Sequence, residues 1–258
     1  MFDAGLWFTA LAALCIVALG GWLISLPLRN VSLVDSLWSL KFLLCGVLYG
    51  ALSPVRGARA TLLVVLLAAW SLRLAGYITW RNRGHGEDRR YQAIRRNNEP
   101  GFAWKSLYLV FGLQAVLAWI ISLPLLAAAN SSGPPGLLDA LGAGLWALGF
   151  VFEACGDQQL ARFKADPANA GKVMDRGLWR YTRHPNYFGE FCLWWGYYAL
   201  ALAGGGWWSL PGPLLMSVLL LKVSGVTLLE KDIGERRPAY ADYIRRTSPF
   251  FPRRPKDA

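Results

Sequence analysis

The sequence predicts an all-α integral membrane protein with seven transmembrane helices. Of its 258 residues, 55% are hydrophobic and only 17% are charged, and the mean hydropathy is +0.31, a balance that soluble domains rarely show. The apolar residues form runs of about 20, enough to cross a hydrocarbon core of about 30 Å. The Lys and Arg residues gather between these runs, as in the cytoplasmic loops of membrane proteins.

The apolar runs lie at about residues 6–26, 33–52, 60–79, 104–128, 137–155, 186–203 and 210–229. Basic residues are concentrated after the third and fifth runs and in the tail, whereas the segments after the fourth and sixth runs have none. Arg56 and Arg59, after the second run, are the exception. The positive-inside rule therefore predicts an N-terminus outside and a C-terminus in the cytoplasm.

The net charge of +11 does not indicate a nucleic-acid partner, because the positive residues lie between apolar runs. Membrane topology, anionic lipid and a phosphorylated cofactor explain it better. The four cysteines lie within apolar runs and form no CxxC pair, so neither a disulfide framework nor a metal site is predicted. The first run lacks a preceding basic region and is read as a retained span rather than a signal peptide.

A helix start is predicted at His184-Pro185, in the stretch 176–190 that joins polar residues to the sixth run. The residue before a proline avoids the helical region, and proline suits the first helical position. Asn186 and Tyr187 then fall in the first turn and Glu190 one turn further on.

Anion binding is one function of such a helix start, because its N–H groups are unpaired and its dipole is positive there. Arg180 and Arg183, just before it, would strengthen an anion site. A membrane helix with a basic cytoplasmic flank has the same pattern, so the residues alone leave both interpretations open.

Asp35 lies near the start of the second run. A carboxylate in an apolar span is costly and faces a cavity or a partner, which indicates function. An interfacial acid in the first helical turn would explain the position of Asp35 equally well.

The polar segment 80–100 carries both charge signs and is long for a connector. It is either a lid over a charged ligand or a solvated loop.

The polar clusters all fall on the predicted cytoplasmic face: the segment after the third run, residues 157–190, and the tail with Tyr240 and Tyr243. Guanidinium groups pair with phosphate oxygens, and Asn and Asp bond sugar or amide groups. A nucleotide is therefore a suitable ligand. The sequence has neither a Gly-rich dinucleotide fingerprint after a strand nor a P-loop, which excludes a Rossmann domain by pattern.

The segment GLWRYTRHPNYFGE, residues 177–190, with Trp195-Gly196 after it, resembles the C-terminal signature of the steroid 5-alpha-reductase family, in particular its bacterial membrane branch. Residues 81–96 and 34–38 resemble the same branch. The resemblance implies a bacterial inner-membrane protein that uses NADPH to reduce a carbon–carbon double bond conjugated to a ketone. It implies one reductase domain, with residues 1–130 around a hydrophobic, steroid-like substrate from the bilayer and residues 137–258 around the cofactor.

The resemblance also implies cofactor contacts, position by position. Asn186 and Glu190 match the residues at the nicotinamide and ribose end. Asp157 and Lys164 match an acid and a base near the adenosine phosphate, with Lys in place of the usual Arg. Arg73 matches an Arg of the third span. The predicted cofactor-binding residues are Arg73, Asp157, Lys164, Arg180, Arg183, His184, Asn186, Tyr187, Glu190, Tyr240 and Tyr243.

Two residues are expected to be catalytic by the same resemblance. Asp35 matches the acid that polarises the ketone, although it is one methylene shorter, and in protonated form it would stabilise the enolate. Trp70 stands where the family has a partner tyrosine. An indole can donate a hydrogen bond but cannot release a proton, so either the acid acts alone or the substrate differs from a steroid.

Two alternatives to the reductase function stay open. Isoprenylcysteine and phospholipid methyltransferases share a similar Arg-His-Pro-x-Tyr segment and bind S-adenosylmethionine at the same helix start. A membrane protein without enzymatic activity would also fit. The spacing of Asn186 and Glu190, the acid of the second run and the seven-run layout favour the reductase.

Overall fold

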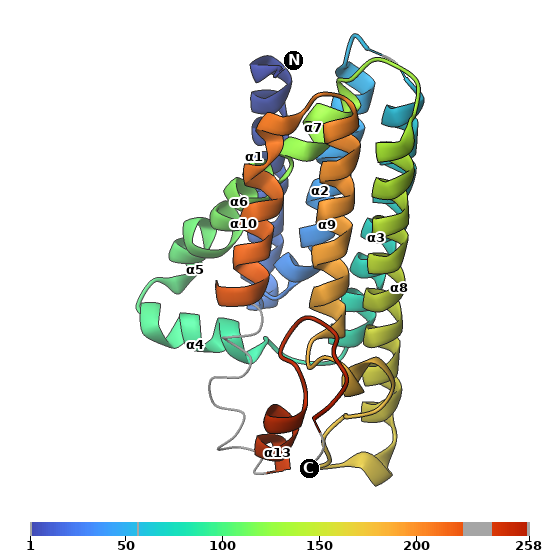
Figure 1. The fold of residues 1–258 in the computed structure, drawn as a ribbon. Coiled ribbons are helices and arrows are strands. Elements are labelled where there is room, and N and C mark those ends of the chain that lie inside the picture. The colour runs from blue at the N-terminus through green and yellow to red at the C-terminus, as the bar shows by residue number, and fades with distance from the viewer. Residues whose placement is uncertain (1, 56, 224–238, 257–258) are drawn as a thin grey trace. The chain divides into compact units, whose positions relative to one another are not determined.

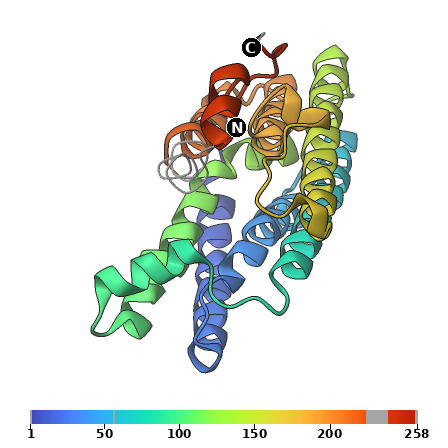
Figure 2. The ribbon, with the colours of Figure 1, turned by 90° about the horizontal axis from the view of Figure 1, so that it is seen from below.

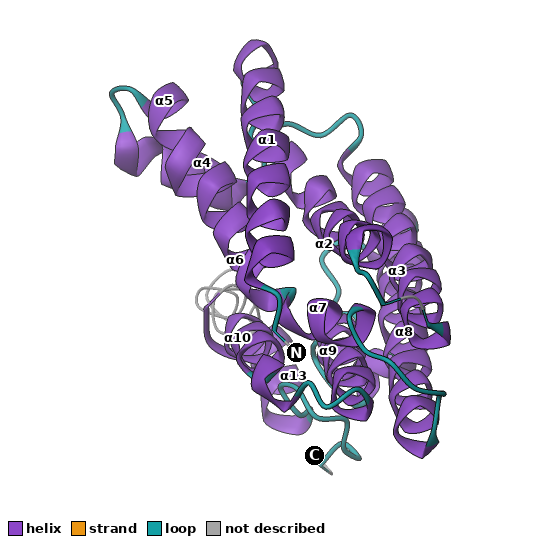
Figure 3. Cartoon of the chain, turned by 90° about the horizontal axis from the view of Figure 1, so that it is seen from above, coloured by secondary structure: helices purple, strands orange, loops and turns teal. Residues whose placement is uncertain are grey.

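A computed structural model describes residues 2–55, 57–223 and 239–256. Across these residues every regular element is a helix and no strand occurs (Figure 3). The chain forms two compact units: residues 1–139 with 200–212, and residues 140–199 with 213–258. The predicted all-α class is confirmed for the described residues.

The first unit is built on three long helices, α1 (Ala4–Leu28), α2 (Leu33–Leu52) and α3 (Ala58–Asn82). Helix α2 packs against both α1 and α3 (Figure 1). The remaining elements of this unit are α4 (Arg89–Asn98), α5 (Phe102–Ser106), the π-helix η1 (Leu107–Gly112), α6 (Leu113–Ile121), α7 (Leu123–Ala129) and the short η4 (Trp207–Ser209).

The second unit contains most of the two helices α8 (Leu137–Ala165) and α9 (Pro185–Ala203). Helix α8 continues without a break from its apolar part into the polar residues 157–164, as the sequence predicts. The other elements are η2 (Pro167–Asn169), η3 (Gly177–Arg180), α10 (Pro211–Val218), η5 (Leu219–Val223) and α13 (Ala239–Arg246).

Five helices are long and apolar enough to cross a membrane, by length and composition: Ala4–Leu28, Leu33–Leu52, Ala58–Asn82, Phe102–Ile121 and Leu137–Ala165. Large apolar side chains point outward from them; Ile16 is 72% exposed, and Leu72 is 60% exposed. Such surfaces suit lipid rather than water. The chain is therefore an integral membrane protein.

The predicted sixth and seventh spans are not among these five. Helix α9 has the predicted bounds, but Asn186, Glu190 and several Tyr and Trp residues lower its hydropathy. The seventh run appears as a shorter apolar helix, Trp207–Val223, and its predicted last residues, 224–229, lie outside the described residues.

Two further predictions need correction. The fourth run is not one helix to residue 128, because α6 ends at Ile121 and α7 begins at Leu123, with Pro124 in its first turn. Proline cannot continue a ladder of helical hydrogen bonds but suits a helix start. The polar segment 80–100 is not a plain loop either, because it contains α4, which packs beside α5 (Figure 2).

A buried ion pair closes the end of the first unit where α3 and α8 begin. Arg59 and Asp139 are each 2% exposed, with Arg59 Nε 2.6 Å from Asp139 Oδ1. Arg59 also donates to Ser131 Oγ at 2.9 Å. Its charge is thus neutralised inside the protein, so Arg59 does not act as a free cation of the segment after α2.

Helices α8 and α9 approach each other closely through glycine. A Cβ on Gly189 would lie 2.5 Å from both the Glu153 nitrogen and the Gly149 oxygen. One on Gly196 would lie 2.8 Å from the Gly142 oxygen. The repeated spacing of seven residues keeps these glycines on one face of each helix. The contact between α8 and α9 therefore depends on glycine at these positions. It holds α8 beside the start of α9.

Candidate functional site

Asp35 in the first turn of α2 is held by two side chains from α4. Arg90 Nη2 lies 2.8 Å from Asp35 Oδ2, and the Tyr91 hydroxyl donates to Asp35 Oδ1 at 2.5 Å. The Asp35 side chain is 14% exposed, and Tyr91 is buried. Both oxygens of the Asp35 side chain thus accept a hydrogen bond, one from a guanidinium and one from a phenol. Its expected role as a protonated acid stays a prediction.

The cluster extends into α6 and the middle of α2. Gln114 Nε2 donates to the Tyr91 oxygen at 3.3 Å, and Lys41 Nζ donates to Gln114 Oε1 at 2.9 Å. Lys41 is almost completely buried. Lys41, Gln114, Tyr91, Asp35 and Arg90 thus form one continuous chain of hydrogen bonds, here called the Asp35 chain.

Helix α4 is placed by the two acids before it. Glu87 Oε1 accepts from the Val31 N–H at 3.0 Å, and the Asp88 N–H donates to Ser32 Oγ at 2.8 Å. Glu87 also pairs with Arg95 at 2.7 Å. These contacts join α4 to the turn between α1 and α2, and so bring Tyr91 to Asp35.

Charges around α4 shift several pKa values. Burial, followed by the negative charge of Asp35, raises the pKa of Tyr91 above its ordinary range, so Tyr91 keeps its proton at neutral pH. Burial alone would raise the pKa of Glu87, but hydrogen bonds from Arg95 and the Val31 N–H outweigh it and lower that pKa. In the same way, the hydrogen bonds from Arg90 outweigh burial and lower the pKa of Asp88.

Acid is expected to loosen α4. Because folding lowers the pKa values of Glu87 and Asp88, their stabilisation is fully present above the unfolded values of about 4 and is lost as pH falls through the folded values. Hydrogen-exchange protection factors of the α4 amides should fall as the pH drops below about 4. Glu87→Gln should reduce this dependence, and protection that stays constant in the native chain would contradict the expectation.

Trp70 and Arg73 both lie on α3. Trp70 is fully buried, with its ring 6.0 Å from that of Phe42, so it has the surroundings of a core residue. Arg73 is half-buried. The tyrosine beside Asp35 is Tyr91, which comes from α4 and not from the third span.

The start of α9 lies where the sequence predicts, at Pro185. Asn186 Nδ2 donates to Asp157 Oδ1 of α8 at 3.3 Å, which brings two predicted cofactor residues together. Asn186 Oδ1 is buried without a hydrogen-bond partner among the described residues. Glu190 is buried one turn further on. His184 is buried too and stacks on Tyr187, with ring centroids 5.5 Å apart.

Arg183 holds the tail. Its guanidinium Nη1 donates to the backbone oxygens of Ile244, at 3.0 Å, and of Thr247, both at the end of α13. Thr182 Oγ1 donates to the Phe250 oxygen at 2.7 Å. Cations suit a helix C-terminus, where carbonyl groups are unpaired. Arg183 Nη1 therefore has a structural role, because it binds the end of α13 to the segment before α9.

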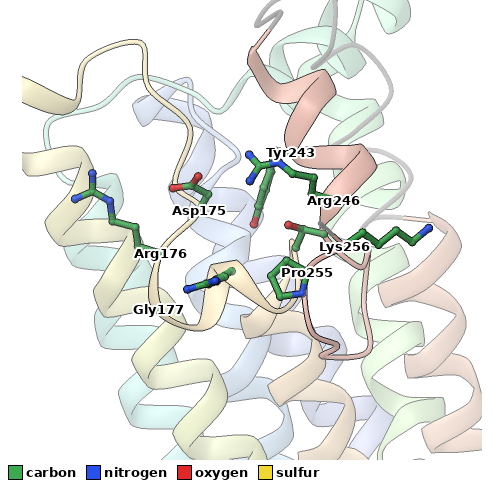
Figure 4. Close-up of a pocket in the computed structure, with 9 residues that line it drawn as sticks. Asp175, Arg176, Gly177, Tyr243, Arg246, Pro255 and Lys256 are labelled. Carbon is green, nitrogen blue, oxygen red and sulfur yellow. The ribbon is translucent and has the colours of Figure 1, made fainter. Parts of the chain in front are cut away.

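A cavity of about 520 Å³ lies in the second unit, between the segment before η3 and the tail (Figure 4). In Figure 4 the lining side chains come from both segments, Asp175 from the first and Tyr243 from the tail, while the Lys256 side chain extends outward. Its lining residues are Asp175, Arg176, Gly177, Arg180, Tyr243, Arg246, Thr247, Pro255 and Lys256. The size is in the range of small-molecule sites, and the cations suit an anionic ligand.

Arg73 lies on α3 in the first unit, and the other predicted cofactor residues fall into separate places within the second unit. Arg180 and Tyr243 line the cavity, and the Tyr243 hydroxyl donates to the Trp179 oxygen. Tyr240 is half-buried, with its ring edge-on to Tyr243 at 5.3 Å. Lys164 is exposed in the last turn of α8.

Several residues of these sites escaped the sequence analysis, among them Tyr91, Arg90 and Gln114. A local signal for α4 does exist: Asp88 is a good N-cap residue, and its side chain accepts from the Arg90 N–H at 2.9 Å. A helix from that point places Tyr91 and Arg95 on one face. No local signal connects that face with Asp35.

No group of three or more His, Cys, Asp or Glu side chains that could hold a metal ion occurs among the described residues.

An uncharacterized protein of Schizosaccharomyces pombe (strain 972) is 26% identical over 263 residues, covering 90% of this chain and 75% of that protein. No solved structure matches the chain. The model of a family described as "Protein of unknown function (DUF1295)" matches residues 21–247. The chain therefore belongs to the DUF1295 family.

Proposed function

We propose that this protein is an NADPH-dependent reductase that reduces a carbon–carbon double bond conjugated to a ketone in a hydrophobic, steroid-like substrate. The observation that supports it most is the Asp35–Tyr91 contact at 2.5 Å. It offers an oriented proton donor in a membrane protein whose sequence resembles the steroid 5-alpha-reductase family. The cationic cavity of the second unit supports a phosphorylated cofactor.

The residues of the second unit fit NADPH chemically. Arg176, Arg180, Arg246 and Lys256 line the cavity and would hold phosphate groups, since guanidinium groups bind phosphate oxygens bidentately. Asn186 Oδ1, buried without a partner among the described residues, would accept a hydrogen bond from the nicotinamide carboxamide. Bound NADPH would supply the hydride that such a reduction consumes.

The Asp35 chain would supply the acid. A ketone oxygen that takes the place of Asp35 as acceptor would receive the hydrogen bond of the Tyr91 hydroxyl, which polarises the carbonyl. Before the ketone binds, Asp35 orients the phenol as its hydrogen-bond acceptor, and Arg90 holds Asp35 at 2.8 Å. Tyr91 therefore takes the role for which the sequence offered Trp70, and Asp35 becomes the group that positions it.

The proposal includes the finer membrane topology: seven spans, an outer N-terminus and a cytoplasmic C-terminus, in a bacterial inner membrane. The buried pair of Arg59 and Asp139 supports it. Because Arg59 is neutralised inside the first unit, one of the two charges that disagreed with the positive-inside rule loses its weight; the other, Arg56, lies outside the described residues. Cysteine labelling from either side, at positions 132 and 166, would test this orientation.

The test of the function is a side-by-side titration of detergent-purified protein with NADPH, NADH and S-adenosylmethionine. Preferential NADPH binding, followed by oxidation of NADPH with a 3-keto-4-ene steroid or a related enone, is the expected result. Binding of S-adenosylmethionine alone would replace the proposal by a membrane methyltransferase. Failure to bind any of the three would contradict both enzymatic functions.

Arg180→Gln is expected to weaken NADPH binding by about tenfold or more, because a charge-assisted hydrogen bond contributes about 1.5–3 kcal/mol. Arg180 lines the cavity directly. The dissociation constant, followed by NADPH fluorescence, measures the effect. Arg162→Gln, at an exposed position of α8, is the matched control and should bind like the native protein. Equal affinities in all three proteins would contradict a phosphate role for Arg180.

A further inference from the structure

Lys41 is a cation inside a helix that could span the membrane, and the proposed reaction does not use it. The residue is 1% exposed. Its Nζ lies 6.0 Å from the centre of the Trp38 ring and donates a hydrogen bond to Gln114. A charge in such a position is costly and indicates a function.

The hydrogen-bonding capacities of the Asp35 chain fix its direction. Lys41 Nζ donates to Gln114 Oε1 at 2.9 Å, which is the only direction open to a protonated lysine. The other end of the amide is then an NH₂ group, which donates to the Tyr91 oxygen. With that side of the phenol occupied by a donor, the Tyr91 proton points at Asp35.

We propose that Lys41 sets the direction of the Tyr91 hydroxyl, acting through Gln114, and is a positioning residue for the Asp35–Tyr91 pair. Lys41 determines which way the amide faces, and the amide determines which way the phenol donates. The kinetic consequence rests on the proposed function, because it assumes that Tyr91 serves the substrate ketone. The orientation itself rests on the contacts alone.

A purely structural role of Lys41 makes the opposite prediction for one substitution, Gln114→Glu. A glutamate keeps the acceptor at 2.9 Å from Lys41 and adds a charge that neutralises the ammonium, so a structural role predicts an unchanged or more stable protein. An ionised carboxylate has no donor for Tyr91. The positioning role therefore predicts a reoriented Tyr91 hydroxyl in the same variant.

The experiment is infrared spectroscopy of protein with isotope-labelled tyrosine, without substrate or cofactor. The C–O stretching band of a tyrosine distinguishes a hydroxyl that only donates from one that also accepts, and Tyr91→Phe assigns the band. Lys41→Met and Gln114→Glu are expected to shift it, whereas Lys41→Arg, which keeps a cation, should restore the native position. Gln158→Glu, at an exposed site of α8, controls for a glutamine-to-glutamate change and should leave the band unchanged.

A native band position in both Lys41→Met and Gln114→Glu would overturn the proposal, whatever the activity. In turnover measurements, Lys41→Met and Gln114→Glu should each lower kcat by about tenfold or more, as misplaced catalytic groups do. The Kd for NADPH should stay unchanged. A shifted band in variants of a protein that reduces no enone would support the orientation and reject the proposed function. The two failures are thus distinguishable.

Discussion

Replacing Tyr91 by Phe is expected to lower kcat by about 100-fold or more while leaving the Kd for NADPH unchanged, since a positioned general acid contributes about 10²–10⁴-fold to a rate. The substitution removes one oxygen, which donates to Asp35 at 2.5 Å and accepts from Gln114 at 3.3 Å. The buried ring stays. Turnover is followed by NADPH oxidation with an enone, and affinity by NADPH fluorescence.

Tyr108→Phe is the matched control, because Tyr108 is 61% exposed on η1 and belongs to neither proposed site. It should turn over like the native protein. Asp35→Asn should also lower kcat, but it leaves Arg90 without its charge partner at 2.8 Å, so its folding must be verified first. Native turnover in Tyr91→Phe, or a loss of NADPH affinity as large as the loss of kcat, would contradict the proposed acid.

The start of α9 could be predicted from the sequence because its cause is local. A proline restricts itself and the residue before it, and the helix does begin at Pro185. The continuous course of α8 into polar residues followed in the same way from the absence of a turn signal. Where neighbouring residues decide the conformation, the sequence predicts the structure well.

The partner of Asp35 could not be predicted, because long-range contacts place it. Helix α4 is short and strongly polar, with few apolar residues, so the segment was interpreted as a loop. Its position depends on hydrogen bonds that Glu87 and Asp88 make with residues 56 positions away, Val31 and Ser32. The buried pair of Arg59 and Asp139, 80 positions apart, escaped for the same reason. Opposite charges in a sequence do not say which of them meet.

The number of membrane spans was hard to predict for a different reason, the mixed apolar and polar composition of α9. Helix α9 was expected from its apolar run and has the expected bounds, yet its aromatic and polar residues keep it outside the group of helices that hydropathy identifies. Tyr and Trp are amphipathic and suit both a buried interface and a membrane boundary. A helix that combines them with Asn186 and Glu190 therefore belongs to a site as much as to a span.

Gly189→Ala is expected to destabilise the second unit by about 3 kcal/mol or more, at the upper end of what overpacking costs. The added Cβ would lie 2.5 Å from the Glu153 nitrogen and the Gly149 oxygen, both of which are backbone atoms of α8. Backbone cannot rotate away as a side chain can, so the two helices must separate. Thermal unfolding in detergent should show a clearly lower Tm.

The same separation should weaken cofactor binding, because Asn186 and Asp157 meet across these helices at 3.3 Å. Gly144→Ala, also on α8, is the control: a Cβ there meets nothing within 4 Å, and Ala favours a helix over Gly by about 1 kcal/mol. It should be as stable as the native protein or slightly more so. If both variants unfold like the native protein, close packing of α8 and α9 does not hold the start of α9 in place.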